Sequence, residues 1–525
     1  MKKSFFTLTL IALLVFAFCG IVNANATDSD TCGDALTWTL DDTGTLTISG
    51  TGKMTDWGSS GEQPWNEYDS SIRFVIIEEG VTSIGSFAFC DCNNLTSISL
   101  PNSLTTINLF PFGNCSSLSE INISKNVTKI GNDFESNFSG CTKLTAIHVD
   151  EENPKYISVE GALFNKSMTR LLDYPANSPN SNFTIPKTVT FIAEEAFHYN
   201  NLSEILVDNE SQYYTSENGV LLNRSKTNLL AYPHGNTQTT YTIPSSVTLI
   251  GASAFRGSNN LVEILIPHSV AIIEDNAFAD CNKLSNIIFP NSVISIGSGL
   301  FKNCRSLKSV TLSAGITEIT HSLFYGCVQL QEVIIPSGIT TISDFSFYGC
   351  TGLTTITLPN SITIIGIGAF QRCINLSHVI LPNSMAIIKQ QAFFDCTNLQ
   401  TVYYGGSEAD WNNITIDIRN DPLLNATIIY QSIPDFFFTD FTTTSSGFAI
   451  TANLSQQLKE QNGIILFAVY HNNFLKRFVP FSAAESVTHN FTSLASGEYT
   501  IKAFYWSDLA NIQPLCAPAE KTFSL

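Results

Sequence analysis

The fold is decided by a stretch that reads Ile273-Glu274-Asp275-Asn276-Ala277-Phe278-Ala279-Asp280-Cys281-Asn282-Lys283-Leu284-Ser285-Asn286-Ile287-Ile288-Phe289-Pro290 and then returns with small changes. Its phenylalanine and its cysteine recur every 23 residues, at Phe278, Phe301, Phe324, Phe347, Phe370 and Phe393 and at Cys281, Cys304, Cys327, Cys350, Cys373 and Cys396. A fixed period of about 20–29 residues is typical of solenoids, in which each unit buries its apolar side against the next. The period therefore predicts a β-rich solenoid with repeats of about 23 residues.

Each repeat has the form Ile-x-x-x-Ala-Phe-x-x-Cys-x-x-Leu-x-x-Ile-x-Leu/Ile-Pro-x-x-Val/Ile. The segment before the proline alternates between polar and apolar residues, as in Ser97-Ile98-Ser99-Leu100. This alternation indicates a strand with one buried side. The proline ends this strand because it cannot donate to the ladder. Ile339-Thr340-Thr341-Ile342 predicts a second short strand, and Ala-Phe-x-x-Cys predicts one short helical turn at the opposite edge.

Nine cysteines share one phase of the repeat: Cys92, Cys115, Cys141, Cys281, Cys304, Cys327, Cys350, Cys373 and Cys396. A residue type that recurs at the same position of each repeat indicates a packing position in the core. Cysteine behaves there as a small apolar side chain. No Cys-x-x-Cys pair occurs, which disfavours a zinc site. We expect most of these thiols to be reduced, although the spacing of neighbouring coils would allow disulfides.

Residues 1–26 read as a signal peptide. Lys2 and Lys3 precede an apolar run from Phe5 to Phe18, and Ala24-Asn25-Ala26 is a cleavage site of the A-x-A kind. The run is too short to favour a membrane anchor, so we expect no transmembrane anchor after its removal. An alternative makes Cys19 a lipidation site, but the bulky Phe18 before it disfavours that interpretation.

The chain is acidic, with a formal net charge of −19 that becomes −21 when the two lysines of residues 1–26 are removed. No basic cluster of the kind that follows a phosphate backbone is present, so nucleic acid is excluded as a partner. A protein, a sugar or a cationic polymer remains a possible ligand.

Residues 27–72 differ from the repeats. Leu36-Thr37-Trp38-Thr39-Leu40 and Thr45-Leu46-Thr47-Ile48-Ser49 flank a turn, which predicts a β-hairpin that caps the solenoid. Asp42-Thr43-Gly44 matches the triplet of aspartic proteases, but such an enzyme needs two of these carboxylates and no second copy exists. We interpret the triplet as a turn.

The solenoid is expected at 73–430, with two long repeats that carry inserts at about 148–186 and 206–244. Each insert predicts a hairpin around its glycine, Gly161 or Gly219, followed by another strand. Insertions in repeat proteins map to one face and often mark a binding region. The alternative is a wider coil with a packing role only.

The period stops near Tyr430. Residues 431–435 predict a linker, and 436–525 predict a small all-β sandwich, because short apolar runs separated by turns extend through this segment. Three of these runs are expected strands, at Ile464 to Tyr470, Phe474 to Phe481 and Tyr499 to Trp506. Ser507 to Leu515 is the expected loop.

Motifs for catalysis are missing from the sequence. The eight histidines fall at different phases, and His-Glu-x-x-His, Gly-x-Ser-x-Gly and a phosphate loop do not occur. Asp28-Ser29-Asp30 suggests calcium, but Cys32 stands where a third oxygen ligand should be. We therefore predict a protein that is not an enzyme and has no cofactor and no metal site, although paired carboxylates that meet only in space could still hydrolyse glycosides.

The outward position of each predicted strand contributes to a largely apolar row, and the outward position two residues earlier carries mainly acidic or polar neighbours. These candidate ligand-binding residues are Leu206, Glu263, Leu265, Ile288, Thr311, Glu332, Ile334, Thr357, His378 and Ile380. An exposed apolar stripe with acidic neighbours suits a protein-binding sheet. The alternatives are that β-branched residues simply favour exposed strands, or that ligands bind at the inserts around Gly161 and Gly219.

Cys32-Gly33-Asp34, Val81-Thr82-Ser83-Ile84-Gly85 and the recurring Ala-Phe-x-x-Cys-x-x-Leu coil resemble the BspA-type leucine-rich repeat proteins of bacterial cell surfaces, from roughly Cys32 to Tyr430. The resemblance implies a right-handed leucine-rich repeat solenoid and an exported or cell-surface protein that adheres to a host or microbial surface protein or glycan. The segment from Gly497 to Trp506 is similar to accessory sandwich domains of secreted bacterial proteins. The alternatives are a purely structural envelope protein and a carbohydrate-active enzyme.

Overall fold

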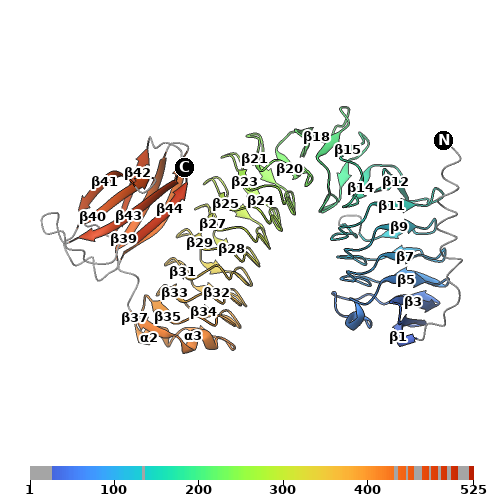
Figure 1. Ribbon diagram of the computed structural model, residues 1–525, viewed down its shortest axis with the longest axis horizontal. Coiled ribbons are helices and arrows are strands. Elements are labelled where there is room, and N and C mark those ends of the chain that lie inside the picture. Colours follow the sequence, from blue (N-terminus) through green and yellow to red (C-terminus); the bar gives the residue numbers. More distant parts are fainter. Residues whose placement is uncertain are drawn as a thin grey trace. The chain divides into compact units, whose positions relative to one another are not determined.

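The computed structural model describes residues 26–132 and 136–430, together with the backbone of seven strands beyond residue 435. The chain divides into two units (Figure 1). Unit 1 comprises Met1–Asn180 and Thr188–Asn201, and unit 2 comprises Ser181–Lys187 and Leu202–Leu525. The predictions for the signal peptide with Cys19, for the linker 431–435 and for the loop from Ser507 lie outside the described residues.

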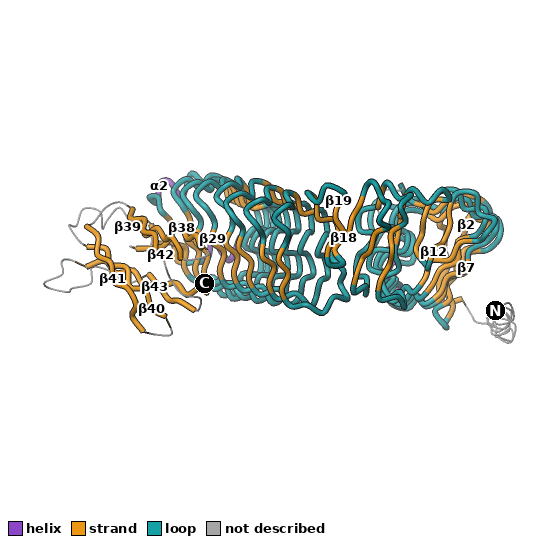
Figure 2. The backbone as a smooth tube through the Cα atoms, turned by 90° about the horizontal axis from the view of Figure 1, so that it is seen from above, coloured by secondary structure: helices purple, strands orange, loops and turns teal. Residues whose placement is uncertain are grey.

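Both units are β-solenoids in which each coil contributes a first strand and a short second strand, and the strands of successive coils lie side by side (Figure 2). The first strands of unit 1 are β5 (Phe74–Ile77), β7 (Ser97–Ser99), β9 (Glu120–Ile123) and β11 (Ala146–Val149). Those of unit 2 are β15 (Asn182–Ile185), β17 (Glu204–Val207), β21 (Thr240–Thr242), β23 (Glu263–Leu265), β25 (Asn286–Ile288), β27 (Ser309–Thr311), β29 (Glu332–Ile334), β31 (Thr355–Thr357), β33 (His378–Leu381), β35 (Thr401–Tyr404) and β37 (Thr427–Tyr430).

The second strands form their own parallel ladders, as the period predicts. In unit 1 they are β4 (Gly52–Lys53), β6 (Val81–Ile84), β8 (Thr106–Ile107), β10 (Lys129–Ile130) and β16 (Phe191–Ile192). In unit 2 they are β22 (Leu249–Ile250), β24 (Ile272–Ile273), β26 (Ser295–Ile296), β28 (Glu318–Ile319), β30 (Thr341–Ile342), β32 (Ile364–Ile365), β34 (Ile387–Ile388) and β36 (Thr415–Ile416). Short helices are η1 (Asn66–Tyr68), α2 (Glu408–Trp411) and α3 (Asp421–Asn425).

The predicted N-terminal hairpin is present. Strands β1 (Ala26–Gly33), β2 (Leu36–Asp41) and β3 (Thr45–Gly50) are antiparallel, and β3 then pairs in parallel with β5 of the first coil. The Asp41 carboxylate accepts hydrogen bonds from the amides of Thr43 and Thr45, which makes the triplet a turn, as interpreted from the sequence. Trp65 stacks on Phe89 with ring centroids 5.7 Å apart, so the hairpin segment joins the aromatic core of the coils.

The Ala-Phe-x-x-Cys segment forms consecutive turns, so the predicted helical turn is wrong. Asn276 and Asp280 have positive φ angles of 54° and 58°. This geometry sends the amides of Asn276, Phe278 and Asp280 to carbonyls of the next coil, while the amide of Ala279 bonds back to Asn276. A helix would need every amide within its own segment, whereas here alternate amides join neighbouring coils.

The core is a spine of stacked phenylalanines, as predicted. The rings from Phe278 to Phe393 are fully buried, and successive centroids lie 5.0–5.7 Å apart. Burial of each ring stabilises the fold by roughly 1.5–3 kcal/mol. The spine requires every coil to keep the same register, which explains the strict period.

The cysteine phase has a specific explanation. Thiols donate a hydrogen bond to the carbonyl of the phenylalanine in the preceding coil, as from Cys304 to Phe278 at 3.0 Å and from Cys327 to Phe301 at 3.0 Å. Burial raises the pKa of the Cys281 thiol to about 12, so this thiol keeps its proton at neutral pH. The eleven described cysteines are buried and free.

Each long repeat carries a three-stranded insert. Insert 1 consists of β12 (Tyr156–Val159), β13 (Ala162–Asn165) and β14 (Arg170–Asp173), and insert 2 of β18 (Tyr214–Glu217), β19 (Val220–Asn223) and β20 (Asn228–Ala231). The first two strands of each insert form an antiparallel hairpin, and the third extends the second-strand ladder. The hairpins around Gly161 and Gly219 are therefore confirmed.

Beyond residue 435 the strands form two antiparallel sheets, ordered β38-β39-β42 and β41-β40-β43-β44. The strands are β38 (Phe436–Thr444), β39 (Gly447–Leu454), β40 (Ile464–His471), β41 (Phe474–Ser482), β42 (Ser486–Thr492), β43 (Glu498–Trp506) and β44 (Ala519–Ser524). The three runs expected as strands correspond to β40, β41 and β43. Packing of the two sheets as a sandwich and the domain boundaries stay predictions.

Candidate binding site

All ten candidate residues lie on first strands of unit 2, from β17 to β33, and together they are called the first-strand row. Parallel register places Ile288 beside Thr311 and Thr311 beside Ile334, and in another ladder it places Thr357 beside Ile380. The side chains of Leu265 and Ile288 are each 45% exposed. The row is divided into four ladders, β15-β17, β21-β23, β25-β27-β29 and β31-β33-β35-β37, so hydrogen bonding along it is interrupted.

The prediction that Ile380 is an exposed residue of the row is wrong, because this residue is only 7% exposed. Tyr403 stands beside it in register on the next strand. The Tyr403 ring also lies against His378, with centroids 6.0 Å apart, so a large side chain occupies the space at this end of the row. The exposed apolar part of the row is therefore Leu265 and Ile288, while Leu206 and Ile334 are half-buried.

Insert 2 is hydrogen-bonded to β17, the strand at the start of this row. Its hairpin turns at Asn218 and Gly219, whose φ angles of 52° and 77° are those of the tight hairpin turn that favours Asn-Gly. The Ile205 amide donates to the Gly219 carbonyl at 2.8 Å, and Ser216 Oγ donates to the Ile205 carbonyl at 2.5 Å. These bonds hold the hairpin against β17, the strand that carries Leu206.

A cleft of about 880 Å³ lies between this hairpin and strands β15 and β17. Its lining is mainly polar, with Leu206 and Tyr214 as its large apolar surfaces; the residues are Thr184, Lys187, Glu204, Leu206, Val207, Asp208, Asn209, Glu210, Tyr214, Thr215, Ser216, Asn218, Gly219 and Arg224. Of the candidate residues only Leu206 enters it. Gly219 also lines the cleft and belongs to the insert that the sequence offered as an alternative site. The other lining residues were not predicted, although the insert was the signal that could have found them.

Some charged side chains of the cleft are paired with one another and others are not. Lys187 and Glu210 form an ion pair, and the Asp208 carboxylate accepts a hydrogen bond from the Glu210 amide at 2.9 Å. Glu204 and Arg224 are exposed, and neither forms an ion pair with any residue that the structure describes. One negative and one positive group are therefore free to bind a ligand.

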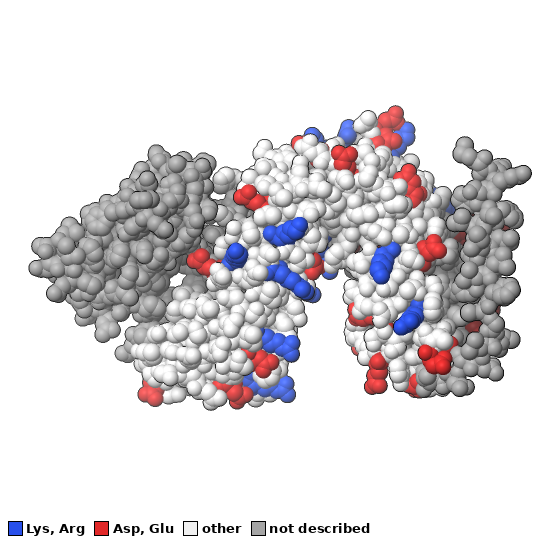
Figure 3. Space-filling view, in the orientation of Figure 1, with Lys and Arg blue, Asp and Glu red and all other residues white. Residues whose placement is uncertain are grey.

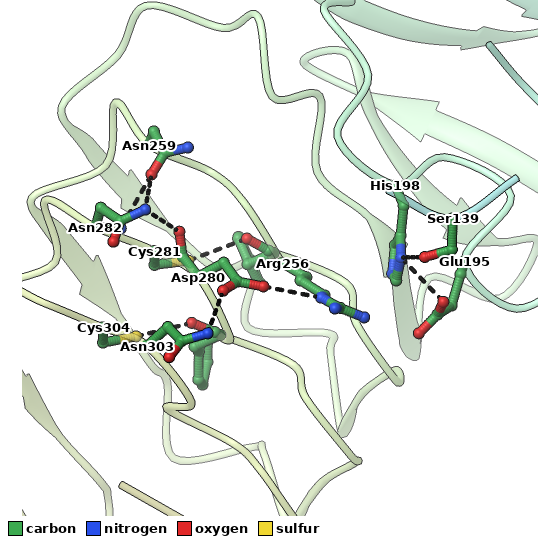
Figure 4. Close-up of polar contacts among 12 residues, drawn as sticks. Ser139, Glu195, His198, Arg256, Asn259, Asp280, Cys281, Asn282, Asn303 and Cys304 are labelled. Atoms are coloured by element: carbon green, nitrogen blue, oxygen red, sulfur yellow. Dashed lines mark hydrogen bonds and ion pairs between the residues drawn. The ribbon is translucent and has the colours of Figure 1, made fainter. Parts of the chain in front are cut away.

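A cluster in unit 1 superficially resembles a catalytic triad (Figure 4). Ser139 Oγ lies 3.4 Å from His198 Nδ1, and Glu195 Oε2 lies 3.2 Å from the same nitrogen. A Ser-His-acid relay uses the two different ring nitrogens. Because serine and carboxylate here share one nitrogen, the cluster lacks the geometry of a relay.

Clusters of metal-ligating side chains and long apolar helices are both absent from the residues that the structure describes. In this part of the chain no group of three or more His, Cys, Asp or Glu side chains is arranged to hold a metal ion. Within the same residues no helix has the length and apolarity needed to span a membrane.

A sequence model that describes the BspA type leucine rich repeat region (6 copies) matches the chain over four stretches, residues 67–178, 173–226, 230–345 and 317–415. No curated protein matches the sequence significantly. Among solved structures, a leucine-rich repeat protein from Eubacterium ventriosum is 27% identical, covering 66% of this chain and 95% of its own, with a TM-score of 0.40. A leucine rich cell surface protein from Faecalibacterium prausnitzii is 24% identical, covering 74% and 98%, with a TM-score of 0.37.

Proposed function

Because the chain belongs to the BspA-type leucine-rich repeat family, we propose that it is a secreted or cell-surface interaction protein. In this proposal a protein or glycan partner binds along the first strands of unit 2. The observation that carries the proposal is the cleft at insert 2, which opens beside a row of exposed apolar residues. Exposed apolar surface of this kind marks interaction sites in soluble proteins.

In this proposal the cleft and the row contact different parts of the partner. Leu265, Ile288 and Ile334 offer apolar area for side chains of a partner, while Glu204 and Arg224 offer charges of opposite sign for its polar groups. A few buried contacts dominate the affinity of most interfaces. We therefore expect the apolar row to supply affinity and the cleft to supply selectivity.

The experiment begins with the full chain on a glycan array and on a panel of extracellular matrix proteins, and the strongest hit is then titrated. Replacing Leu265, Ile288 and Ile334 together by Ser should weaken binding at least about ten-fold, since loss of central contacts often costs more than 1.4 kcal/mol. A matched control replaces three exposed apolar residues that lie outside the first strands, Ile272, Ile294 and Ile418, by Ser.

The control triple variant should bind as the unchanged chain does. Equal losses in both triple variants, or an unaffected first variant, would contradict the proposal for the row. Glu204→Gln with Arg224→Gln tests the cleft separately, and should change the order of preference among the array hits. An unchanged order would remove the cleft from the binding surface.

A further inference from the structure

A second surface of unit 2 lies at the turns that follow the core phenylalanines. The residue directly after the phenylalanine is Lys302, Tyr325, Tyr348, Gln371 and Phe394 in five successive coils. Backbone hydrogen bonds keep these positions in register, since the amide after each one donates to the carbonyl of the next, with N–O distances of 2.7–2.8 Å. Each core phenylalanine points inward, so the following side chain stands at the surface.

Three side chains of this column, together with Arg372, which directly follows Gln371, are stacked in a fixed order. The rings of Tyr325 and Tyr348 are nearly parallel, 7° apart in orientation, with centroids at 4.5 Å. Lys302 Nζ lies 5.5 Å from the Tyr325 centroid, and Arg372 Cζ lies 5.8 Å from the Tyr348 centroid. Both distances are within the range of cation–π attraction. The two cations are therefore held in place before any partner binds.

A second column runs beside the first, at the residue after each cysteine: Arg305, Val328, Thr351 and Ile374. Val328 and Ile374 are 41% and 42% exposed. We call the surface formed by Lys302, Arg305, Tyr325, Val328, Tyr348, Arg372 and Ile374 the turn ridge. It combines three exposed cations, two stacked rings and two exposed aliphatic side chains.

The charge of the turn ridge is positive in a chain whose net charge is −19. Arg372 pairs with Asp395 at 3.7 Å, but both side chains are exposed, so the pair is weak. Among the residues that the structure describes, no carboxylate forms an ion pair with Lys302 or Arg305. Figure 3 shows several basic side chains along one edge of the unit 2 coils, with acidic side chains among them.

We propose that the turn ridge binds an acidic polypeptide segment and that it does so independently of the first-strand row. Charge complementarity selects an anionic partner. The faces of Tyr325 and Tyr348 are occupied by each other and by the two cations, so neither ring offers a free face for a sugar or a nucleobase. Val328 and Ile374 instead match apolar side chains of a peptide.

The geometry also sets the spacing of the acidic groups. Lys302 and Arg372 are three coils apart, and strands lie about 4.8 Å apart, so the two cations are separated by roughly 14 Å. An extended peptide rises about 3.3 Å per residue. Two carboxylates about four residues apart, with apolar residues between them, would therefore reach both cations at once.

The test measures fluorescence anisotropy of labelled peptides with the full chain. One peptide carries two Glu residues four positions apart with Leu and Val between them, and the other has the same composition with the two Glu adjacent. We expect the spaced peptide to bind at least about ten-fold more tightly. Lys302→Glu with Arg372→Glu should abolish that preference, whereas Lys129→Glu with Lys308→Glu, the matched charge control, should keep it.

Dichroism spectra of both double variants establish that the fold is intact, and Tyr348→Ala provides a variant of unchanged charge that should weaken the spaced peptide by disordering Arg372. Equal affinity for the two peptides would overturn the proposal, as would equal losses in both double variants. Tight binding of a heparin fragment with no binding of either peptide would assign the ridge to acidic polysaccharides and also overturn it. The triple variant of the first-strand row should bind the spaced peptide normally.

Discussion

Insert 1 and insert 2 match residue by residue at a distance of 58 positions, and their backbones are held in the same way. In insert 1 the Ile147 amide donates to the Gly161 carbonyl at 2.9 Å, and in insert 2 the Ile205 amide donates to the Gly219 carbonyl at 2.8 Å. A serine of each hairpin donates to the carbonyl of the same isoleucine. Because these backbone contacts are shared, the backbones of the two inserts follow the same path.

The side chains at matched positions differ. Insert 1 ends in Asp173, a fully buried carboxylate that accepts hydrogen bonds from Ser136 Oγ at 2.5 Å and from the Asn137 amide at 3.1 Å. Insert 2 has the half-buried Ala231 at that position. The comparison teaches that the insert backbone is a reusable frame, and that a few side chains decide whether it is anchored from within or open to a ligand.

The largest expected effect is the pH dependence of the anchor. Burial raises the pKa of Asp173 from 3.8 to about 7, and the nearby Glu195 adds to the rise, against the hydrogen bonds from Ser136 and Asn137. Because the folded pKa lies above the unfolded one, the stabilisation is complete below about pH 4 and is lost as the pH rises through 7. The change is on the order of 4 kcal/mol over this window.

Asp173→Asn should remove that dependence. Urea denaturation from pH 5 to 8, followed by the fluorescence of the tryptophans of unit 1, measures it. The free energy of unfolding of the unchanged protein should fall relative to the variant as the pH rises. Parallel curves for the two proteins would mean that the buried carboxylate does not titrate in this range.

The second effect concerns the turn glycines. Gly161 and Gly219 have φ angles of 83° and 77°, so replacement by Ala costs about 1–2 kcal/mol in each. A Cβ at Gly219 would also lie 2.9 Å from Glu204 Cγ and 3.1 Å from its Cα, closer than the nearest atom at Gly161, 3.2 Å away on Ala146. Hydrogen exchange of the hairpin amides should therefore accelerate more in Gly219→Ala than in Gly161→Ala, and the reverse order would refute the tighter packing of insert 2.

The third effect concerns the repeat position that carries cysteine in nine coils, where Asn200 and Ser258 stand instead. Replacing these two residues by Cys should change the stability of the fold in opposite directions. Asn200 Nδ2 donates to the Phe197 carbonyl at 2.6 Å, whereas the buried Ser258 Oγ has no partner among the described residues. Asn200→Cys should destabilise by about 1 kcal/mol and Ser258→Cys should stabilise by a similar amount. Thermal unfolding measures both, and a common sign would contradict the difference between the repeats.

The smallest effect is at the first turn residue, Glu160 in insert 1 and Asn218 in insert 2, both with a φ of 52°. Asparagine tolerates this left-handed conformation better than glutamate. Glu160→Asn should stabilise by a few tenths of a kcal/mol up to about 1 kcal/mol, and Asn218→Glu should destabilise by as much. Denaturation midpoints measure the pair, and shifts of equal sign would show that other contacts of the turn dominate.

The period alone was sufficient to predict the fold. Phe278 and its five equivalents had to stack because a 23-residue unit cannot bury its own apolar side, and the cysteine phase had to be a packing position for the same reason. The strand positions followed from the alternation before each proline. The turn segment was predicted wrongly, because alternate amides there bond to the next coil, as from Phe278 to Leu300, and a local pattern does not show bonds to residues 22 positions away.

The sequence by itself also determined which residues belong to the first-strand row, because strand alternation is a local property. Only the tertiary structure decided which of them are exposed, since the exposure of Ile380 depends on Tyr403 in the next coil. The cleft likewise exists because insert 2 folds back on β17 through bonds at Ile205. Cavities and ring stacks depend on side chains brought together from separate coils, and a repeat pattern records the alignment of coils but not the shape that particular side chains make between them.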